Sequence, residues 1–290
     1  MKTPRPGSRK QGGFTLVEMS VVLVLVGLLF AAVTKGQELV DQAKAKRLVN
    51  DMIVMGDQLQ LYSQAKGRFP GDCNADGVID YDLGATSRLD TDTETRAARY
   101  AFTPLLPTIP GNGVEASAQT DGCALTGGAF TAGVAGTPAV PPELSTVATS
   151  ASNANVWLND LKLASIVSDS APNRNLAKTI NEDFMFVGSI ADGEGDSADE
   201  ARYNAIVIHN VPQAMAMRMA VAINGQDSMA NRSRLRSLKR DATDGTYEAT
   251  WQVVDAGASA DTAAMRDAMV TIVYFFDRIP ESKATPVNPT

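Results

Sequence analysis

The sequence predicts an α+β fold in which one long N-terminal α-helix packs on an antiparallel β-sheet domain with large loop insertions. Residues 14–66 contain no proline, and their second half places apolar side chains at steps of three and four, which is typical of an amphipathic helix. Later in the chain, short segments rich in β-branched and aromatic residues indicate strands. The expected strands are Phe184–Val187, Tyr203–His209, Thr246–Val254 and Met269–Phe276, and the expected shorter helices are Ala154–Ile166 and Val211–Ile223.

The first element is an apolar segment behind a basic leader. Residues 1–13 contain four basic and no acidic side chains, whereas residues 14–33 (FTLVEMSVVLVLVGLLFAAV) contain a single charge, Glu18. Twenty helical residues cover about 30 Å, the hydrocarbon thickness of a bilayer. The positive-inside rule keeps the leader cytoplasmic and places everything after residue 33 on the other side of the inner membrane.

Two more ordinary segments are alternatives to this one. A secretory signal peptide has an apolar core of about 7–15 residues and a small-residue cleavage site after it, whereas this core is longer and residues 31–35 (AAVTK) form only a weak cleavage site. A plain membrane anchor has no use for a carboxylate inside its helix, which costs a few kcal/mol by insertion scales. The acid needs a cationic partner, and no basic side chain follows it before Lys35. A new α-amino group just before the apolar run would supply one.

The stretch GGFTLVE over residues 12–18, followed by an uninterrupted apolar helix, resembles the class III signal of type IV pilins and pseudopilins. The resemblance covers roughly the first 55 residues. It implies that a prepilin peptidase cleaves after Gly13, that Phe14 becomes the N-methylated first residue, and that Glu18 pairs with the N-terminal amine of a neighbouring subunit. Many family members carry a proline where this chain has Lys35, so the place where the helix melts during assembly is open here.

The resemblance also implies a division of the chain. We expect a cleaved leader (1–13), an N-terminal helix (14–66) with a transmembrane part (14–33) and an amphipathic stalk (34–66), and an extracytoplasmic body (67–290). Gly67 and Pro70 should end the helix. The side chains of the stalk that we expect to lie on the body are Leu39, Val40, Ala43, Val49, Met52, Ile53, Leu59 and Tyr62.

An acidic loop directly after the stalk is a candidate calcium site. Its residues at positions 1, 3, 5, 7 and 9 resemble the start of an EF-hand loop, with a glycine at position 6. Position 12 should be an acid but is Leu83, and the nearest acid precedes it by one residue. The alternative is an Asx-rich turn that closes the helix. The predicted calcium ligands are Asp72, Asn74, Asp76, Val78 (through its carbonyl), Asp80 and Asp82.

Cysteines and a basic run provide two further candidate sites. The chain has two cysteines, Cys73 and Cys123. An oxidising compartment favours a disulfide between them over two free thiols. Residues 231–240 (NRSRLRSLKR) contain five basic side chains and no acid, which suits a solvated loop, a contact with another subunit or a polyanion site. The basic residues of this run are Arg232, Arg234, Arg236, Lys239 and Arg240.

Composition argues against catalysis and nucleic-acid binding as the main role. The 290 residues carry a formal charge of −7. Without the basic leader, 22 basic and 33 acidic side chains remain, a charge of −11. An acidic chain is a poor nonspecific nucleic-acid binder. The single histidine, His209, follows an apolar strand and is expected to be structural, and no nucleophile, P-loop or metalloprotease motif is present.

The sequence therefore predicts a non-enzymatic, homo-oligomeric filament subunit without a cofactor other than calcium. Its expected partners are a prepilin peptidase, the inner membrane before assembly and the filament assembly machinery. The expected location is the inner membrane, then an extracellular pilus or a periplasmic pseudopilus. The alternative is a minor or tip subunit acting as an adhesin, a DNA receptor or a secretion-system component.

Overall fold

The structure, a computed structural model, describes residues 16–84, 96–97, 99–100, 154–168, 170–192, 201–226, 229–238, 247–251 and 269–280. The chain divides into two compact units, Met1–Ala43 and Lys44–Thr290. The leader, the loop at 124–152 and both ends of the predicted strand Thr246–Val254 lie outside the described residues.

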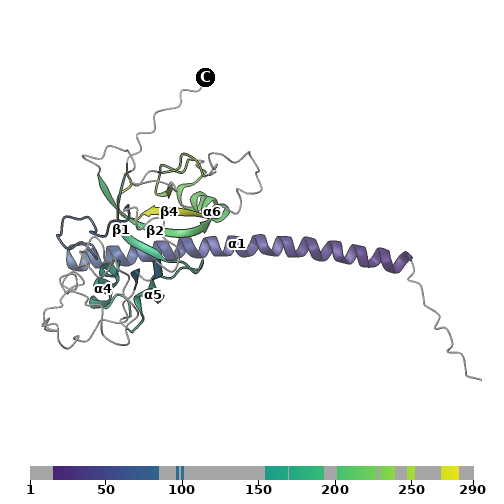
Figure 1. The fold of residues 1–290 in the computed structure, drawn as a ribbon, viewed down its shortest axis with the longest axis horizontal. Coiled ribbons are helices and arrows are strands. Elements are labelled where there is room, and N and C mark those ends of the chain that lie inside the picture. Colours follow the sequence, from purple (N-terminus) through teal and green to yellow (C-terminus); the bar gives the residue numbers. More distant parts are fainter. Residues whose placement is uncertain are drawn as a thin grey trace, which may run out of the picture. The chain divides into compact units, whose positions relative to one another are not determined.

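The N-terminal helix of the prediction is α1, Leu16–Lys66, and it contains 51 residues (Figure 1). It ends where the sequence predicts: Gly67 has φ +77°, a left-handed conformation that glycine adopts without strain, and its N–H donates to the Ser63 carbonyl at 2.8 Å. The second compact unit begins at Lys44, so the last part of the predicted stalk folds with the body.

A four-stranded antiparallel sheet forms the centre of the body. In the order β1-β2-β4-β3 its strands are β1 (Met185–Ala191), β2 (Arg202–Pro212), β4 (Met269–Phe275) and β3 (Leu235–Leu238). All three pairings are antiparallel, with Val187 opposite Ile206 and Val207 opposite Val273. The α+β fold is therefore confirmed.

Three shorter helices complete the described body: α4 (Val156–Leu163), α5 (Asn173–Leu176) and α6 (Gln213–Asn224). In Figure 1, the sheet and α6 lie on one side of the C-terminal part of α1, and α4 and α5 lie on the other. The two predicted helices thus exist as α4 and α6, each within a few residues of the expected bounds. Residues 247–251, inside the predicted strand Thr246–Val254, make only isolated bridges, to Met229 and Leu238.

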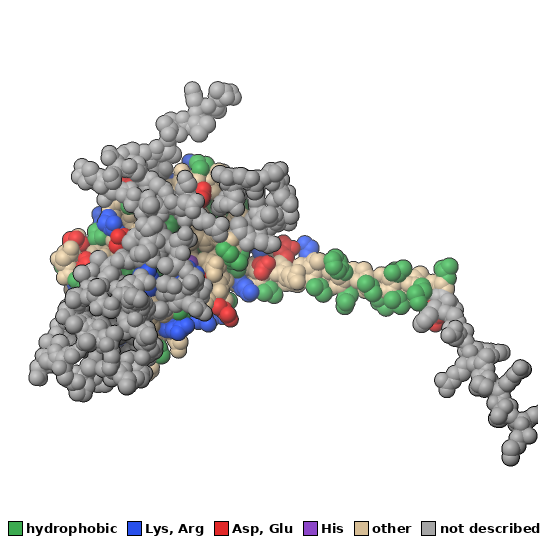
Figure 2. Space-filling view, viewed as in Figure 1, with side chains coloured by type: hydrophobic (Ala, Val, Ile, Leu, Met, Phe, Trp, Pro, Cys, Tyr) green, Lys and Arg blue, Asp and Glu red, His purple; other side chains and the backbone are tan. Residues whose placement is uncertain are grey.

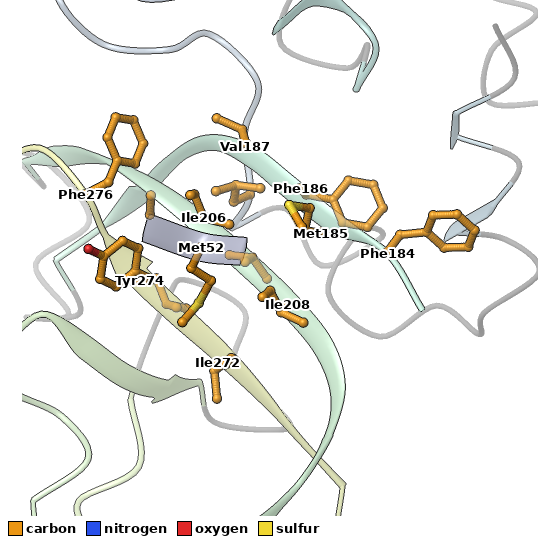
Figure 3. Close-up of a cluster of buried hydrophobic side chains, with 14 of the residues drawn as sticks. Met52, Phe184, Met185, Phe186, Val187, Ile206, Ile208, Ile272, Tyr274 and Phe276 are labelled. Carbon is orange, nitrogen blue, oxygen red and sulfur yellow. The ribbon is translucent and has the colours of Figure 1, made fainter. Parts of the chain in front are cut away.

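The core lies between α1 and the sheet. Met52 is fully buried against Ile206, Ile208 and Ile272, with Tyr274 and Phe276 beside them (Figure 3). A methyl group at Gly56 would meet Phe276 Cβ at 3.3 Å, so a residue without a side chain allows the helix to approach the end of β4 closely.

The predicted buried stripe of the stalk is partly wrong. Met52, Leu59 and Tyr62 are buried, but Ile53 is 43% exposed. Leu39, Val40 and Ala43 belong to the first compact unit, so their contact with the body stays a prediction. The stripe that packs on the body consists of Ala45, Leu48, Met52, Gly56, Leu59 and Tyr62. These residues follow one another at steps of three and four, so they lie on one face of the helix, and that face includes small residues as well as large apolar ones.

Candidate functional site

The N-terminal half of α1 exposes its apolar side chains all round the helix. Figure 2 shows those on the face toward the viewer. Leu23, Leu29 and Phe30 are each about 70% exposed. Helix α1 is long and apolar enough to cross a membrane, by length and composition, and none of its most apolar stretch is buried in the structure. A helix that is apolar all round requires either lipid or other helices around it. Glu18 lies in its first turn.

Polar side chains in this half are satisfied within the helix. Ser20 Oγ donates to the Val17 carbonyl at 2.8 Å, and Thr34 Oγ1 donates to the Ala31 carbonyl at 3.0 Å. Such bonds remove the cost of placing a hydroxyl in an apolar medium. The helix also continues through Lys35, which forms an exposed ion pair with Glu38 at 3.0 Å. Gly13 and Phe14, the predicted processing site, lie outside the described residues.

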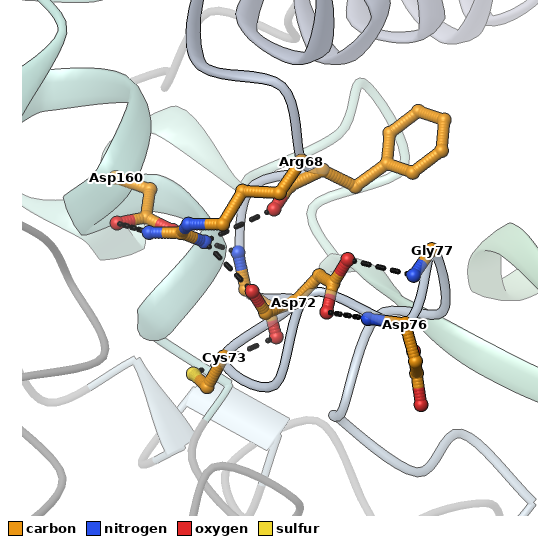
Figure 4. Close-up of polar contacts among 8 residues, drawn as sticks. Arg68, Asp72, Cys73, Asp76, Gly77 and Asp160 are labelled. Carbon is orange, nitrogen blue, oxygen red and sulfur yellow. Dashed lines mark hydrogen bonds and ion pairs between the residues drawn. The ribbon is translucent and has the colours of Figure 1, made fainter.

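The acidic loop after α1 is held by its own carboxylates (Figure 4). Asp72 is fully buried, and its two oxygens accept the N–H groups of Asp76 and Gly77 at 3.2 and 3.0 Å. Asn74 Oδ1 also accepts the Asp76 N–H, and Asp76 Oδ1 accepts the Val78 N–H. This is the geometry of successive Asx turns, the alternative to a metal loop.

Calcium binding by this loop stays a prediction. Among the residues that the structure describes, no three His, Cys, Asp or Glu side chains come together in a way suited to hold a metal ion. Asp82 is directed to Arg202, with which it forms an ion pair, and to the Gly84 N–H. Burial raises the pKa of Asp72, and the N–H groups that it accepts oppose that rise.

Two side chains that the sequence did not single out anchor the loop to the body. Asp160 on α4 is fully buried; its Oδ2 accepts Arg68 Nη1 at 3.0 Å and the Gly71 N–H at 2.8 Å (Figure 4). Asn204 on β2 accepts the Ile79 N–H and donates to the Gly77 carbonyl, each at 2.8 Å. Both contacts join residues about 90 or more positions apart in the chain, so no local pattern indicates them.

The end of the loop extends the sheet. The Ser189 N–H donates to the Tyr81 carbonyl at 2.8 Å, and the Leu83 N–H donates to the Ser189 carbonyl at 2.9 Å. These bonds pair residues 81–83 with the outer edge of β1. A methyl group at Gly188 would lie 2.2 Å from the Tyr81 carbonyl oxygen, so only glycine fits there. The edge of the sheet is thereby covered.

The predicted disulfide is not tested. Cys73 does not carry a free thiol, but its predicted partner, Cys123, lies outside the described residues. The pairing therefore stays a prediction.

The basic run at 231–240 is largely structural, and its prediction as a surface contact is wrong for Arg236. This side chain is 1% exposed; its guanidinium lies 5.1 Å from the centre of the Phe275 ring and donates to the Pro280 carbonyl at 2.6 Å. Arg234 donates to the carbonyls of Phe275 and Phe276, at 3.0 Å each. Arg232 is exposed, and Lys239 and Arg240 lie outside the described residues. The run contains β3, which the sequence analysis missed.

His209 is a core side chain, as expected of a structural histidine. It is 3% exposed, its Nδ1 lies 3.2 Å from Thr271 Oγ1, and its ring meets Phe186 edge-on. Burial, followed by the nearby Arg96 charge, lowers the pKa of His209 to about 3. Arg96 is paired with Asp183 through two hydrogen bonds in the same buried region. The imidazole is thus neutral at cellular pH.

Comparisons with known proteins agree with this N-terminal helix. The family model for the prokaryotic N-terminal methylation motif matches residues 8–34. The chain is also 36% identical over 66 residues to a type II secretion system core protein G from Aeromonas hydrophila, a match that covers 21% of this chain and 44% of that protein. No solved structure matches significantly. The chain thus carries the prokaryotic N-terminal methylation motif of the type IV pilins and pseudopilins, joined to an α+β body.

Proposed function

We propose that the chain is a structural subunit of a type IV filament and polymerises through the N-terminal half of α1. The observation that carries the proposal is the exposed apolar surface of residues 16–33 of α1, in which the single charge is the Glu18 carboxylate in the first turn. The methylation motif covers that same stretch. The motif implies processing by a prepilin peptidase, which would cleave after Gly13 and methylate Phe14.

The exposed helix fits two successive environments. Its apolar residues cover about 30 Å, so it can cross the inner membrane while the chain is a precursor. In the filament, the same side chains would be buried against the helices of neighbouring copies. The body, folded around its own core, does not need that surface for its stability.

Glu18 would then set the register between copies. A carboxylate buried among apolar helices without a cationic partner costs about 3–5 kcal/mol. Only the arrangement that brings the N-terminal amine of a neighbouring Phe14 to Glu18 avoids that cost. Assembly would therefore be selected by one buried ion pair, and the protein would act as a scaffold rather than as a catalyst.

The test is Glu18→Ala, with Asp41→Ala, an exposed acid farther along the same helix, as the matched control. We expect both variants to be cleaved and methylated normally, as measured by mass spectrometry of the N-terminal peptide. Glu18→Ala should lower the amount of chain recovered in filaments, whereas Asp41→Ala should not. Normal filament levels from Glu18→Ala would show that the pairing role is wrong.

Between a pilus and a secretion pseudopilus, the comparison with a core protein of a type II secretion system favours the second. The chain spans less than half of that relative, so the assignment to secretion is part of this proposal. Deleting the gene should then block export of folded proteins across the outer membrane. Abundant methylated Phe14 peptide in sheared surface material, with export intact, would instead indicate a pilus.

A further inference from the structure

Exposed apolar side chains on the body gather in two places. In the described part of Lys44–Thr290, seven large apolar side chains are exposed: Ile53, Val54, Leu61, Met217, Val221, Met269 and Ile279. The first three form a stalk patch on α1. Met217 and Val221 lie four residues apart on α6 and form the α6 patch. Met269 and Ile279 belong to neither patch.

The α6 patch lies next to an arginine. Helix α6 packs on the sheet through Met215, Ala216 and Met219, which leaves its other face outward. Arg218 is half-buried on that helix, three residues before Val221. Its Nη1 is shielded from solvent and has no hydrogen-bond partner among the residues that the structure describes. A charged donor without an acceptor is unfavourable, so a guanidinium turned outward to the carboxylate of another chain would gain a charge-assisted hydrogen bond.

The stalk patch contains the complementary charge. Asp57 is exposed, four residues after Ile53 and four residues before Leu61. On a helix, residues three and four apart are neighbours, so these apolar side chains flank the carboxylate. Asp57 forms no ion pair with any residue that the structure describes, and the same holds for Arg218. One patch therefore offers an acid between apolar side chains, and the other offers a base.

We propose that the α6 patch of one copy docks on the stalk patch of a second copy, with Arg218 turned outward to pair with Asp57. The inference rests on the proposed filament and names a contact between its subunits. Two different patches on the same chain make a heterologous contact, which propagates as an open helical array when it does not close into a ring. That is the type of interface that a filament subunit needs in addition to its helical core.

A charge exchange in the full-length chain tests the contact. The variants are Arg218→Glu, Asp57→Arg and the double exchange, with Arg278→Glu as the control, since that side chain is 66% exposed and belongs to neither patch. Like charges facing each other across an interface cost several kcal/mol. We expect each single exchange to lower the chain recovered in filaments about tenfold or more. The double exchange should restore it, and Arg278→Glu should leave it unchanged.

Several results would overturn the contact. The contact is wrong if the single exchanges assemble normally. It is also wrong if the double exchange assembles as poorly as the single ones, which is the result expected if another protein covers the α6 patch. Tryptophan fluorescence melting shows whether each variant is folded. Val221→Lys, at a 54% exposed position, is a second variant that tests the α6 patch and leaves Arg218 itself unchanged.

The failure of this contact can be told from the failure of the filament itself. If the wild-type chain assembles, Glu18→Ala does not, and Arg218→Glu assembles like the wild type, then only the α6 contact is wrong. If the wild-type chain forms no filaments, the proposed function fails and the contact fails with it.

Discussion

Lowering the pH from 7 to 5 should destabilise the body through one side chain, His209. Burial lowers the pKa of this imidazole to about 3, compared with about 6.5 in an unfolded chain. Between these two values the unfolded state binds a proton that the folded state does not, so the free energy of unfolding falls as the pH falls. The stability from the neutral imidazole is fully present above pH 6.5 and is lost toward pH 3.

The magnitude follows from one proton. One bound proton changes the free energy of unfolding by about 1.4 kcal/mol per pH unit, so the loss between pH 7 and pH 5 is about 2 kcal/mol. The chain has no second histidine, so no other imidazole contributes in this window. Burial raises the pKa of Asp183, but the hydrogen bonds from Arg96 outweigh that effect and lower it. Asp183 therefore also lowers the free energy of unfolding as the pH falls, but only below about pH 4. Burial raises the pKa values of Asp51 and Asp72, so their contribution has the opposite sign and increases the free energy of unfolding as the pH falls.

The assay is denaturant unfolding of the full-length chain in detergent, followed by the fluorescence of Trp157 and Trp251, which are 1% and 4% exposed. His209→Gln is the comparison, because glutamine stays neutral and keeps a polar group near Thr271. We expect the variant to be less stable at pH 7 but to lose almost nothing between pH 7 and pH 5. A wild-type chain whose stability is flat over this window, or a variant with the wild-type slope, would refute the reasoning.

Three further predictions concern the loop after α1. If the loop binds calcium, the ion should raise the melting temperature relative to a chelator and Asp72→Asn should abolish that shift; an equal melting temperature in both buffers would sink the site. Gly188→Ala should lower the free energy of unfolding by about 1–3 kcal/mol, because the new methyl group overlaps the Tyr81 carbonyl; wild-type stability in urea would contradict the observed pairing. Asp160→Asn should cost about 3–5 kcal/mol by leaving Arg68 without its carboxylate, and a loss below about 1 kcal/mol would show that the pair is not important.

The elements with strong local signals were predictable from the sequence. Helix α1 ends at Lys66 because Gly67 adopts a left-handed conformation there, and β1, β2 and β4 overlap three of the predicted strands. These segments combine a clear period with a clear end. The strand β3 has neither: its sequence is LRSL, and it lies in a run of arginines that resembles a surface loop.

Arg236 shows why that strand was missed. Its guanidinium lies over the rings of Tyr247 and Phe275 and donates to the carbonyls of Asp192 and Pro280. The two carbonyls belong to residues 44 positions away in the chain, so no local pattern in the sequence indicates that this charge is buried.

The stalk makes the same point for apolar residues. Hydrophobicity alone placed Ile53 on the body, although it is exposed, and overlooked Ala45 and Gly56, which are buried. Burial on a helix is decided by the side that faces the sheet, and a small residue on that side is required wherever the backbones approach closely. An exposed Ile53 then needs its own explanation, because a folded body has no reason to keep a cluster of large apolar side chains in water beside an acid. A docked copy supplies that reason, so the error in the predicted stripe indicates the surface on which the interface should be sought.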